Sequence, residues 1–136
     1  MAGFPGETDQ GFEQTCQTFL DLPFAYCHVF TFSERDGTPA ARKTNILSMD
    51  ERRRRSSRLR RLSSAKRHDF YEAQVGREAI ILIEDPEDGF WPAYTENYVR
   101  VLLRSERTDL ANRRARVRLR EARPEYVEAE LLELLD

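Results

Sequence analysis

The residue types best suited to chemistry in this sequence are arginines and aromatic side chains in its second half. Guanidinium groups neutralise phosphate, and exposed rings stack on unpaired bases for about 1–3 kcal/mol each. This combination predicts binding of single-stranded or looped RNA. A solvated strand face with the rings in the core is the alternative, because nearby acidic residues dilute the positive charge. Arg114, Arg116 and Arg118 are expected on one strand face, with Arg100 and Arg104 on a neighbouring strand. The candidate residues are Arg77, Trp91, Tyr94, Tyr98, Arg100, Arg114, Arg116 and Arg118.

No other segment carries a catalytic or metal-binding pattern. His28 and His68 have no Ser-His-Asp or Cys-His partner at a recognisable spacing, and no H-x-x-x-H, C-x-x-C or EF-hand pattern occurs. Ten residues separate Cys16 from Cys27, which is not a zinc or iron–sulfur spacing. Cys16 falls on the apolar face of an expected helix, so we expect a small buried thiol.

The stretch GFPGETD at Gly3–Asp9 predicts a tight turn that leads into a helix, with Thr8 or Asp9 as its cap. It is not a phosphate loop, because the Lys-Ser/Thr pair is missing and Glu7 would repel phosphate. Glu7 would suit a cationic group, such as the amino group of a bound ligand. A plain residue at the start of a helix is the interpretation that spacing favours.

The elements that follow resemble one unit of an α/β sheet. Residues 8–22 have helical spacing, and FAYCHVFTF at residues 24–32 has the character of a buried strand that ends in a Gly/Pro loop. Such a unit cannot bury its own faces, so it requires neighbours.

A long basic helix is expected from about Met49 to Gln74, with Ser48 and Glu51 as a capping box and Gly76 as its stop. Its apolar positions are sparse, and Arg52 to Arg55 cover a full turn, which predicts a weakly packed linker. The helix could hold RNA backbone by charge. It could also pair with acidic surfaces elsewhere, and the acidic tail at 121–136 is the nearest candidate.

Residues 76–136 change to a period of two, as in REAIILIED and in NRRARVRLREA, where Ala115, Val117 and Leu119 alternate with arginines. The segment EYVEAELLELL at 125–135 fits a final strand or a short helix. Short strands separated by turn signals predict a small all-β barrel. The fold class is therefore α+β.

Composition excludes an integral membrane protein. Of the 136 residues, 40% are hydrophobic and 34% are charged, and no apolar run approaches the roughly 18 residues needed to span a bilayer. The net charge of −2 hides a segregation, because residues 42–69 hold eleven Arg or Lys against three Asp or Glu. No signal peptide is evident, so the cytoplasm is the expected compartment.

These segments together resemble the carboxy-terminal part of the radical S-adenosylmethionine tRNA methylthiotransferases. The resemblance rests on GFPGET, on LPFAYCHVFTFSERDGTPAA, on an Arg-rich helix that ends in AKRHDFYEAQVGRE, and on AYTENYVRV. It covers nearly the whole chain in order. It is strongest for the branch that acts on threonylcarbamoyl-adenosine beside the anticodon.

The resemblance implies three parts. Residues 1–41 would be the end of a radical-enzyme α/β barrel, with Gly6 and Glu7 near bound S-adenosylmethionine. Residues 42–75 would be the linker helix. Residues 76–136 would be a TRAM domain, an OB-like β-barrel that holds the tRNA anticodon stem-loop.

The family uses 4Fe-4S clusters, but its C-x-x-x-C-x-x-C triplet is absent from this sequence. We therefore expect this chain alone to bind no cofactor and to be inactive, with a separate upstream polypeptide carrying the catalytic half. Two alternatives remain: a stand-alone RNA-binding TRAM module, and a truncated product that exposes Phe19, Leu20, Phe24 and Phe30.

Overall fold

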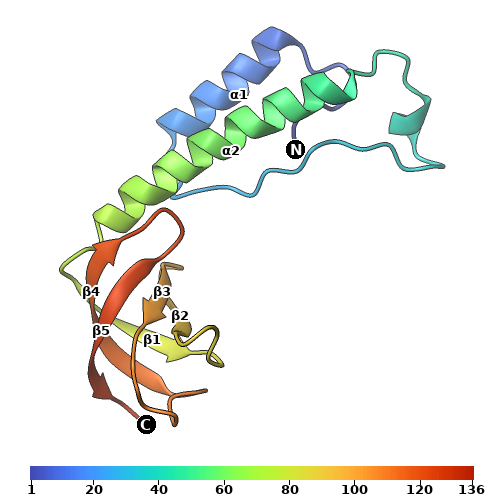
Figure 1. The fold of residues 1–136 in the computed structure, drawn as a ribbon. Helices are drawn as coiled ribbons and strands as arrows, with labels where there is room; N and C mark the ends of the chain where they lie inside the picture. Colours follow the sequence, from blue (N-terminus) through green and yellow to red (C-terminus); the bar gives the residue numbers. More distant parts are fainter. The chain divides into compact units, whose positions relative to one another are not determined.

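The computed structural model describes all 136 residues and is a small α+β protein with two α-helices and a closed five-stranded barrel. The chain forms two compact units, Met1–Lys66 and Arg67–Asp136, and the long helix α2 (Met49–Glu72) runs from the first into the second. Figure 1 traces the elements in chain order.

The first unit holds α1 (Asp9–Asp21), a short 3-10 helix η1 (Pro39–Arg42) and most of α2. Thr8 caps α1, because its hydroxyl accepts the Gly11 amide at 3.0 Å. The preceding turn has Gly3 at φ +81° and Gly6 at φ +88°, a region that glycine enters without strain. The expected turn and helix are confirmed, and Cys16 is buried as expected.

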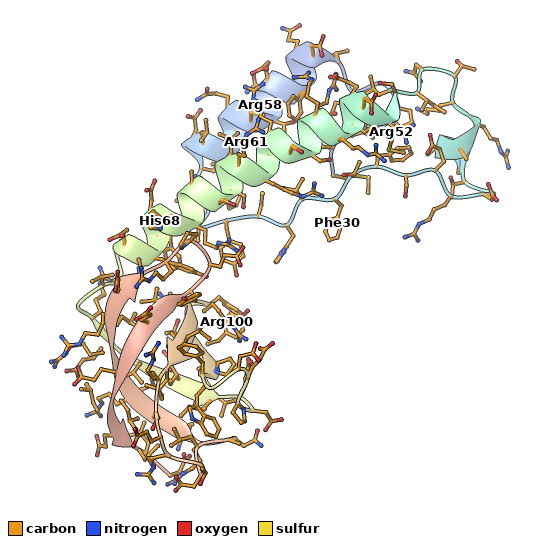
Figure 2. All side chains as sticks on the ribbon, viewed as in Figure 1. Phe30, Arg52, Arg58, Arg61, His68 and Arg100 are labelled. Atoms are coloured by element: carbon orange, nitrogen blue, oxygen red, sulfur yellow. The ribbon has the colours of Figure 1, made fainter.

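The prediction of a strand at residues 24–32 is wrong. Thr31 forms an isolated parallel bridge to Ala2, and the rest of the segment belongs to no sheet. A strand requires a neighbouring strand whose backbone groups form hydrogen bonds with its amides and carbonyls. In the first unit only Ala2 pairs with this segment in that way. Phe30 is consequently 64% exposed, and its ring points away from α2 (Figure 2).

Helix α2 begins at Met49 as expected and ends two residues before the expected Gln74, and Gly76 follows at φ +86°. The Glu51 amide donates to Ser48 Oγ at 3.2 Å, but the Glu51 carboxylate binds Arg54 and Arg55. The reciprocal half of the capping box is therefore absent. Weak packing is also wrong for the first turns, because Arg52 and Arg55 are themselves buried.

The second unit is a barrel with strand order β1-β2-β3-β5-β4. Neighbouring strands are antiparallel except for β3 and β5, which are parallel. The segment at 125–135 thus forms a strand over Val127–Leu134, which resolves the alternative with a helix. The strands are β1 (Glu78–Ile83), β2 (Trp91–Thr95), β3 (Arg100–Leu103), β4 (Arg114–Ala122) and β5 (Val127–Leu134).

Alternation along β4 sets the inside and outside of the barrel. Ala115, Val117 and Leu119 point into the core, and the arginines between them face outward, as the period of two predicts. Tyr71 of α2 lies in the same core cluster. The barrel therefore has a hydrophobic core of its own.

Candidate nucleic-acid interface

Strand register brings three candidate side chains and one further residue, Leu82, into one row across the outside of the barrel. Arg114 of β4 lies opposite Leu82 of β1, Leu82 lies opposite Tyr94 of β2, and Tyr94 lies opposite Arg100 of β3. Leu82 is 56% exposed and Tyr94 is 42% exposed. We call these four residues the outer row. It presents an aliphatic and an aromatic side chain between two cations.

The two ends of the outer row differ in what holds their arginines. The Arg100 guanidinium lies 4.6 Å from the centroid of the Tyr94 ring and donates to Glu84 at 2.8 Å. Arg114 pairs with Asp136 at 2.7 Å, and this contact lowers the pKa of that carboxyl. Both pairs are exposed, so exchanging the carboxylate for a phosphate costs little.

The other candidate arginines of β4 are paired as well. Arg116 lies opposite Ile80 in the register and is 3.2 Å from Glu133, and Arg118 contacts Glu78 at 2.6 Å. The carboxyl groups of β1 and β5 therefore offset the charge that the sequence places on β4. The β4 face is a mixed-charge surface.

The structure corrects one expected adjacency. The sequence suggested that Arg100 and Arg104 lie on a strand beside β4, but β4 pairs with β1 and β5. Arg104 follows β3 and lies over the Phe90 ring at 5.1 Å. The row nevertheless brings Arg100 and Arg114 onto the same face, separated by Leu82 and Tyr94.

The remaining aromatic candidates are placed differently. Trp91 is 5% exposed and packs in the barrel core, whereas Tyr98 is 70% exposed at φ +62° in the turn between β2 and β3. Sequence reasoning missed Ile80 and Leu82, which face outward. Every residue of the run AIILI is apolar, so residue type alone does not show which of them face outward. Burial along β1 nevertheless alternates with the period of two that identified β4.

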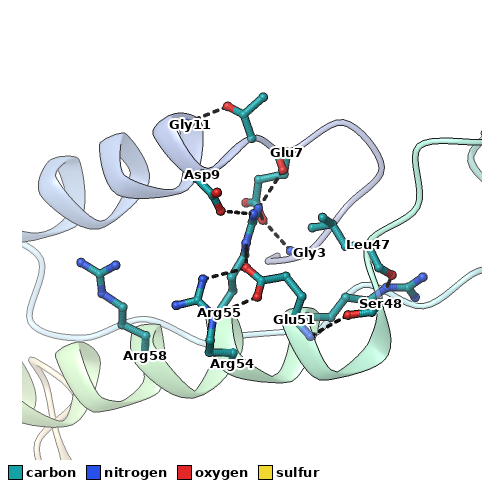
Figure 3. Close-up of polar contacts among 12 residues, drawn as sticks. Gly3, Glu7, Asp9, Gly11, Leu47, Ser48, Glu51, Arg54, Arg55 and Arg58 are labelled. Carbon is teal, nitrogen blue, oxygen red and sulfur yellow. Dashed lines mark hydrogen bonds and ion pairs between the residues drawn. The ribbon is translucent and has the colours of Figure 1, made fainter.

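The first unit contains a buried ion cluster around Glu7 (Figure 3). The Glu7 carboxylate accepts from the Gly3 amide at 2.7 Å and from Arg55 at 2.9 Å, and its side chain is 3% exposed. Arg55 also binds Asp9 and Glu51. Gly6 lies next to this cluster, and its amide donates to the Asn45 carbonyl at 3.3 Å. The Glu7 carboxylate, which the sequence suggested for a cationic ligand, thus accepts hydrogen bonds from the chain itself.

A second buried arginine holds the loop that precedes α2. Arg52 forms two hydrogen bonds to Glu34, at 2.8 and 2.5 Å, and donates to the carbonyls of Phe32 and Leu47. These bonds lower the pKa of Glu34 to about 2. Bonds from Arg54 and Arg55 likewise lower the pKa of Glu51 to about 2.

The acidic tail is not the main partner of the basic helix. Five α2 arginines of the first unit bind carboxylates of that unit, and Lys66 donates to the Phe19, Leu20 and Leu22 carbonyls at the end of α1. In the second unit, Arg67 lies 3.6 Å from Glu125 of the tail. The other tail carboxylates pair with β4 and the turn that follows it.

The chain contains no group of three His, Cys, Asp or Glu side chains that could hold a metal. Cys16 is buried, which raises the pKa of its thiol, and Cys27 lies in a different segment. These residues do not fit an iron–sulfur cluster, which needs at least three thiolates. No helix has the length and apolar character required to cross a membrane.

Known proteins similar to this chain modify tRNA. The threonylcarbamoyladenosine tRNA methylthiotransferase MtaB of Rickettsia prowazekii is 37% identical over 103 residues, covering 76% of this chain and 23% of the relative. MtaB of Bacillus subtilis is 29% identical across 100% of this chain and 31% of its own length. A tRNA-2-methylthio-N(6)-dimethylallyladenosine synthase of Desulfitobacterium hafniense is 31% identical over 63% of this chain and 19% of the relative. No family model matches the chain.

Proposed function

This chain is homologous to the tRNA methylthiotransferases, of which it spans about a fifth to a third in length, and from this premise we propose that its barrel holds tRNA. The reaction served is methylthiolation of a modified adenosine next to the anticodon. The outer row carries the proposal, because it combines an exposed ring with cations on both sides. A tRNA partner implies the cytoplasm as the compartment.

The proposed mode of binding follows from the chemistry of the row. The Tyr94 ring would stack on an unpaired base of the anticodon loop while Leu82 covers its edge. Arg100 and Arg114 would exchange their exposed carboxylate partners for phosphates on the two sides of that base. The barrel would then act as the TRAM domain over residues 76–136.

The catalytic part of the reaction belongs to further polypeptide under this proposal. The first unit would be the end of a radical-enzyme barrel over residues 1–41, with α2 as the linker at 42–75. Exposed apolar side chains support packing against additional chain, since Phe24 and Phe30 are 51% and 64% exposed. S-adenosylmethionine near Gly6 and Glu7 stays a prediction, and the Glu7 carboxylate already binds Arg55.

One observation favours a second function, a stand-alone RNA-binding module without catalysis. The barrel core draws its buried side chains from residues 71–127, and the second unit is compact by itself. A domain of this kind can bind RNA without the first unit.

The proposal is tested by fluorescence anisotropy of a labelled tRNA anticodon stem-loop titrated with the full chain at two salt concentrations. We expect affinity to fall with salt, and we expect Tyr94→Ala and Arg114→Glu each to weaken binding about tenfold or more. Arg123→Glu is the matched control, because Arg123, whose side chain is 43% exposed, is an arginine of the same unit whose partners, Glu121 and Glu128, bind no arginine of the row. Equal losses in the control and the row variants would contradict the proposal.

A further inference from the structure

A hollow of about 500 Å³ lies on the outside of the barrel beside the outer row. The outward-facing Ile80 contributes to its lining, together with the polar residues Gln74, Arg77, Glu96 and Asn97. Ile80 and Thr95 also line the smaller hollow of about 330 Å³ that contains Leu82 and Tyr94. The two hollows therefore form a continuous surface next to the proposed stacking ring.

Two charged side chains in the larger hollow are unpaired. Neither Arg77 nor Glu96 forms a side-chain hydrogen bond or ion pair within the chain. The arginines of the neighbouring β4 strand are all engaged by carboxylates, as Arg114, Arg116 and Arg118 show. Arg77 is therefore available to bind an anionic group of a ligand, and Glu96 is available to accept hydrogen bonds from the same ligand.

A chain of polar side chains fixes the carboxamides beside Glu96. Thr95 Oγ1 donates to Asn97 Oδ1 at 2.6 Å, and Asn97 Nδ2 donates to Gln74 Oε1 at 3.3 Å. Gln74 is 8% exposed, and its nitrogen donates to the Phe70 carbonyl at 3.4 Å. A carboxamide nitrogen carries two N–H groups, so Asn97 keeps one donor without a partner in the chain.

We propose that this hollow binds one unpaired guanine of the RNA, an inference that rests on the proposed function and specifies its target. The pairing edge of guanine presents two adjacent donors, N1–H and N2–H, followed by the O6 acceptor. The Glu96 carboxylate accepts from both donors, and the free N–H of Asn97 donates to O6. Arg77 neutralises the attached phosphate. The other three bases lack two donors followed by an acceptor, so the pattern excludes them.

The test uses the full chain and labelled seven-nucleotide RNAs that are uridine except for a central guanine, adenine or inosine. Anisotropy is expected to show guanine bound about tenfold more tightly than adenine, since a bidentate contact discriminates by roughly that factor. Inosine, which lacks the N2 amino group, falls between them. In Glu96→Gln the preference for guanine over adenine disappears, while binding of the adenine RNA is retained.

The matched control is Glu106→Gln, which removes one negative charge from an exposed glutamate of the same unit outside the hollow. It retains the guanine preference. Asn97→Asp is the second variant, and it weakens guanine binding because an acceptor then faces O6. Equal affinity for guanine and adenine in the unmodified chain overturns the inference but leaves the proposed function standing. Absence of binding to all three RNAs also overturns the inference, and the anticodon stem-loop titration decides the proposed function separately.

Discussion

At the scale of single residues, the first unit is held by arginines that are buried among its apolar side chains. Arg55 is 2% exposed and binds Glu7, which is buried, together with the exposed Asp9. Its guanidinium also lies 5.4 Å from the Phe12 ring. Removal of one member of a buried ion pair leaves its partner uncompensated, and that costs more than the pair contributes.

We therefore expect Arg55→Ala to lower the free energy of unfolding by about 3–5 kcal/mol. Urea denaturation followed by circular dichroism at 222 nm reports this change, because both helices belong wholly or largely to the first unit. Arg53→Ala is the control, since Arg53 is exposed and 3.8 Å from Asp50. A loss in Arg55→Ala no larger than that in Arg53→Ala would show that the buried cluster does not stabilise the unit.

The carboxylates bound by Arg52, Arg54 and Arg55 make the stability of the first unit depend on pH. The pKa values of Glu34 and Glu51 fall from 4.5 to about 2 on folding. Groups with a lowered pKa contribute stability that is complete above about 4.5 and is lost as pH falls toward 2.

The urea concentration at the midpoint of unfolding, followed by the helical signal, should therefore decrease as the pH is lowered from 5 to 2. Glu34→Gln should lower the midpoint at pH 7 and flatten its dependence on pH, because one titrating group is gone. A midpoint that is constant over this range in the unmodified chain would mean that these ion pairs contribute no stability.

At the scale of elements, the turn at residues 3–8 lies against α2 so closely that a side chain does not fit. A Cβ atom on Gly3 would lie 2.7 Å from Arg52 Cγ and 2.8 Å from Arg52 Cβ. Arg52 is buried and bound to Glu34, so it cannot move aside freely. Gly37 has nearly the same backbone angle, φ +79°, and open space around it.

We expect Gly37→Ala to cost about 1–2 kcal/mol through backbone strain. Gly3→Ala should cost a further 1–3 kcal/mol, roughly, because the new methyl group overpacks the contact with α2. Thermal unfolding of the two variants by circular dichroism separates strain from crowding. Equal melting temperatures would contradict the close approach of the turn to α2.

Elements whose pattern is set by local periodicity could be predicted from the sequence, and those set by distant partners could not. The alternation in β4 follows from the geometry of a strand and needs no knowledge of the neighbours. The segment at 24–32 has strand composition but finds one bridge, at Thr31. Burial of Arg52 and Arg55 depends on carboxylates up to 48 residues away, which no local window contains.

The candidate site shows the same division. The sequence identified Tyr94, Arg100 and Arg114 by residue type, but their alignment into a row depends on the pairing of four strands. It placed Arg100 beside β4, which the closed barrel does not allow. Predicting that Leu82 faces outward requires knowing which alternate residues of β1 face the core.

At the scale of the whole molecule, the two compact units predict separable stability. The barrel core includes Tyr71 and excludes the side chains that fill the first unit, such as Phe12 and Leu59. A chain of residues 67–136 should therefore fold alone, with cooperative urea unfolding seen by Trp91 fluorescence. It should bind the anticodon stem-loop within about threefold of the full chain if the outer row supplies the contacts. Loss of folding or of binding in this shorter chain would assign an essential role to residues 1–66.

RNA is proposed to contact this chain at the outer row, and chemical-shift mapping measures the position of that contact directly. Amide spectra of the ¹⁵N-labelled full chain would be recorded with increasing amounts of anticodon stem-loop RNA. We predict that the largest shifts cluster at Leu82, Tyr94, Arg100 and Arg114. Shifts confined to the exposed arginines of α2, or shifts absent at the outer row, would contradict the account.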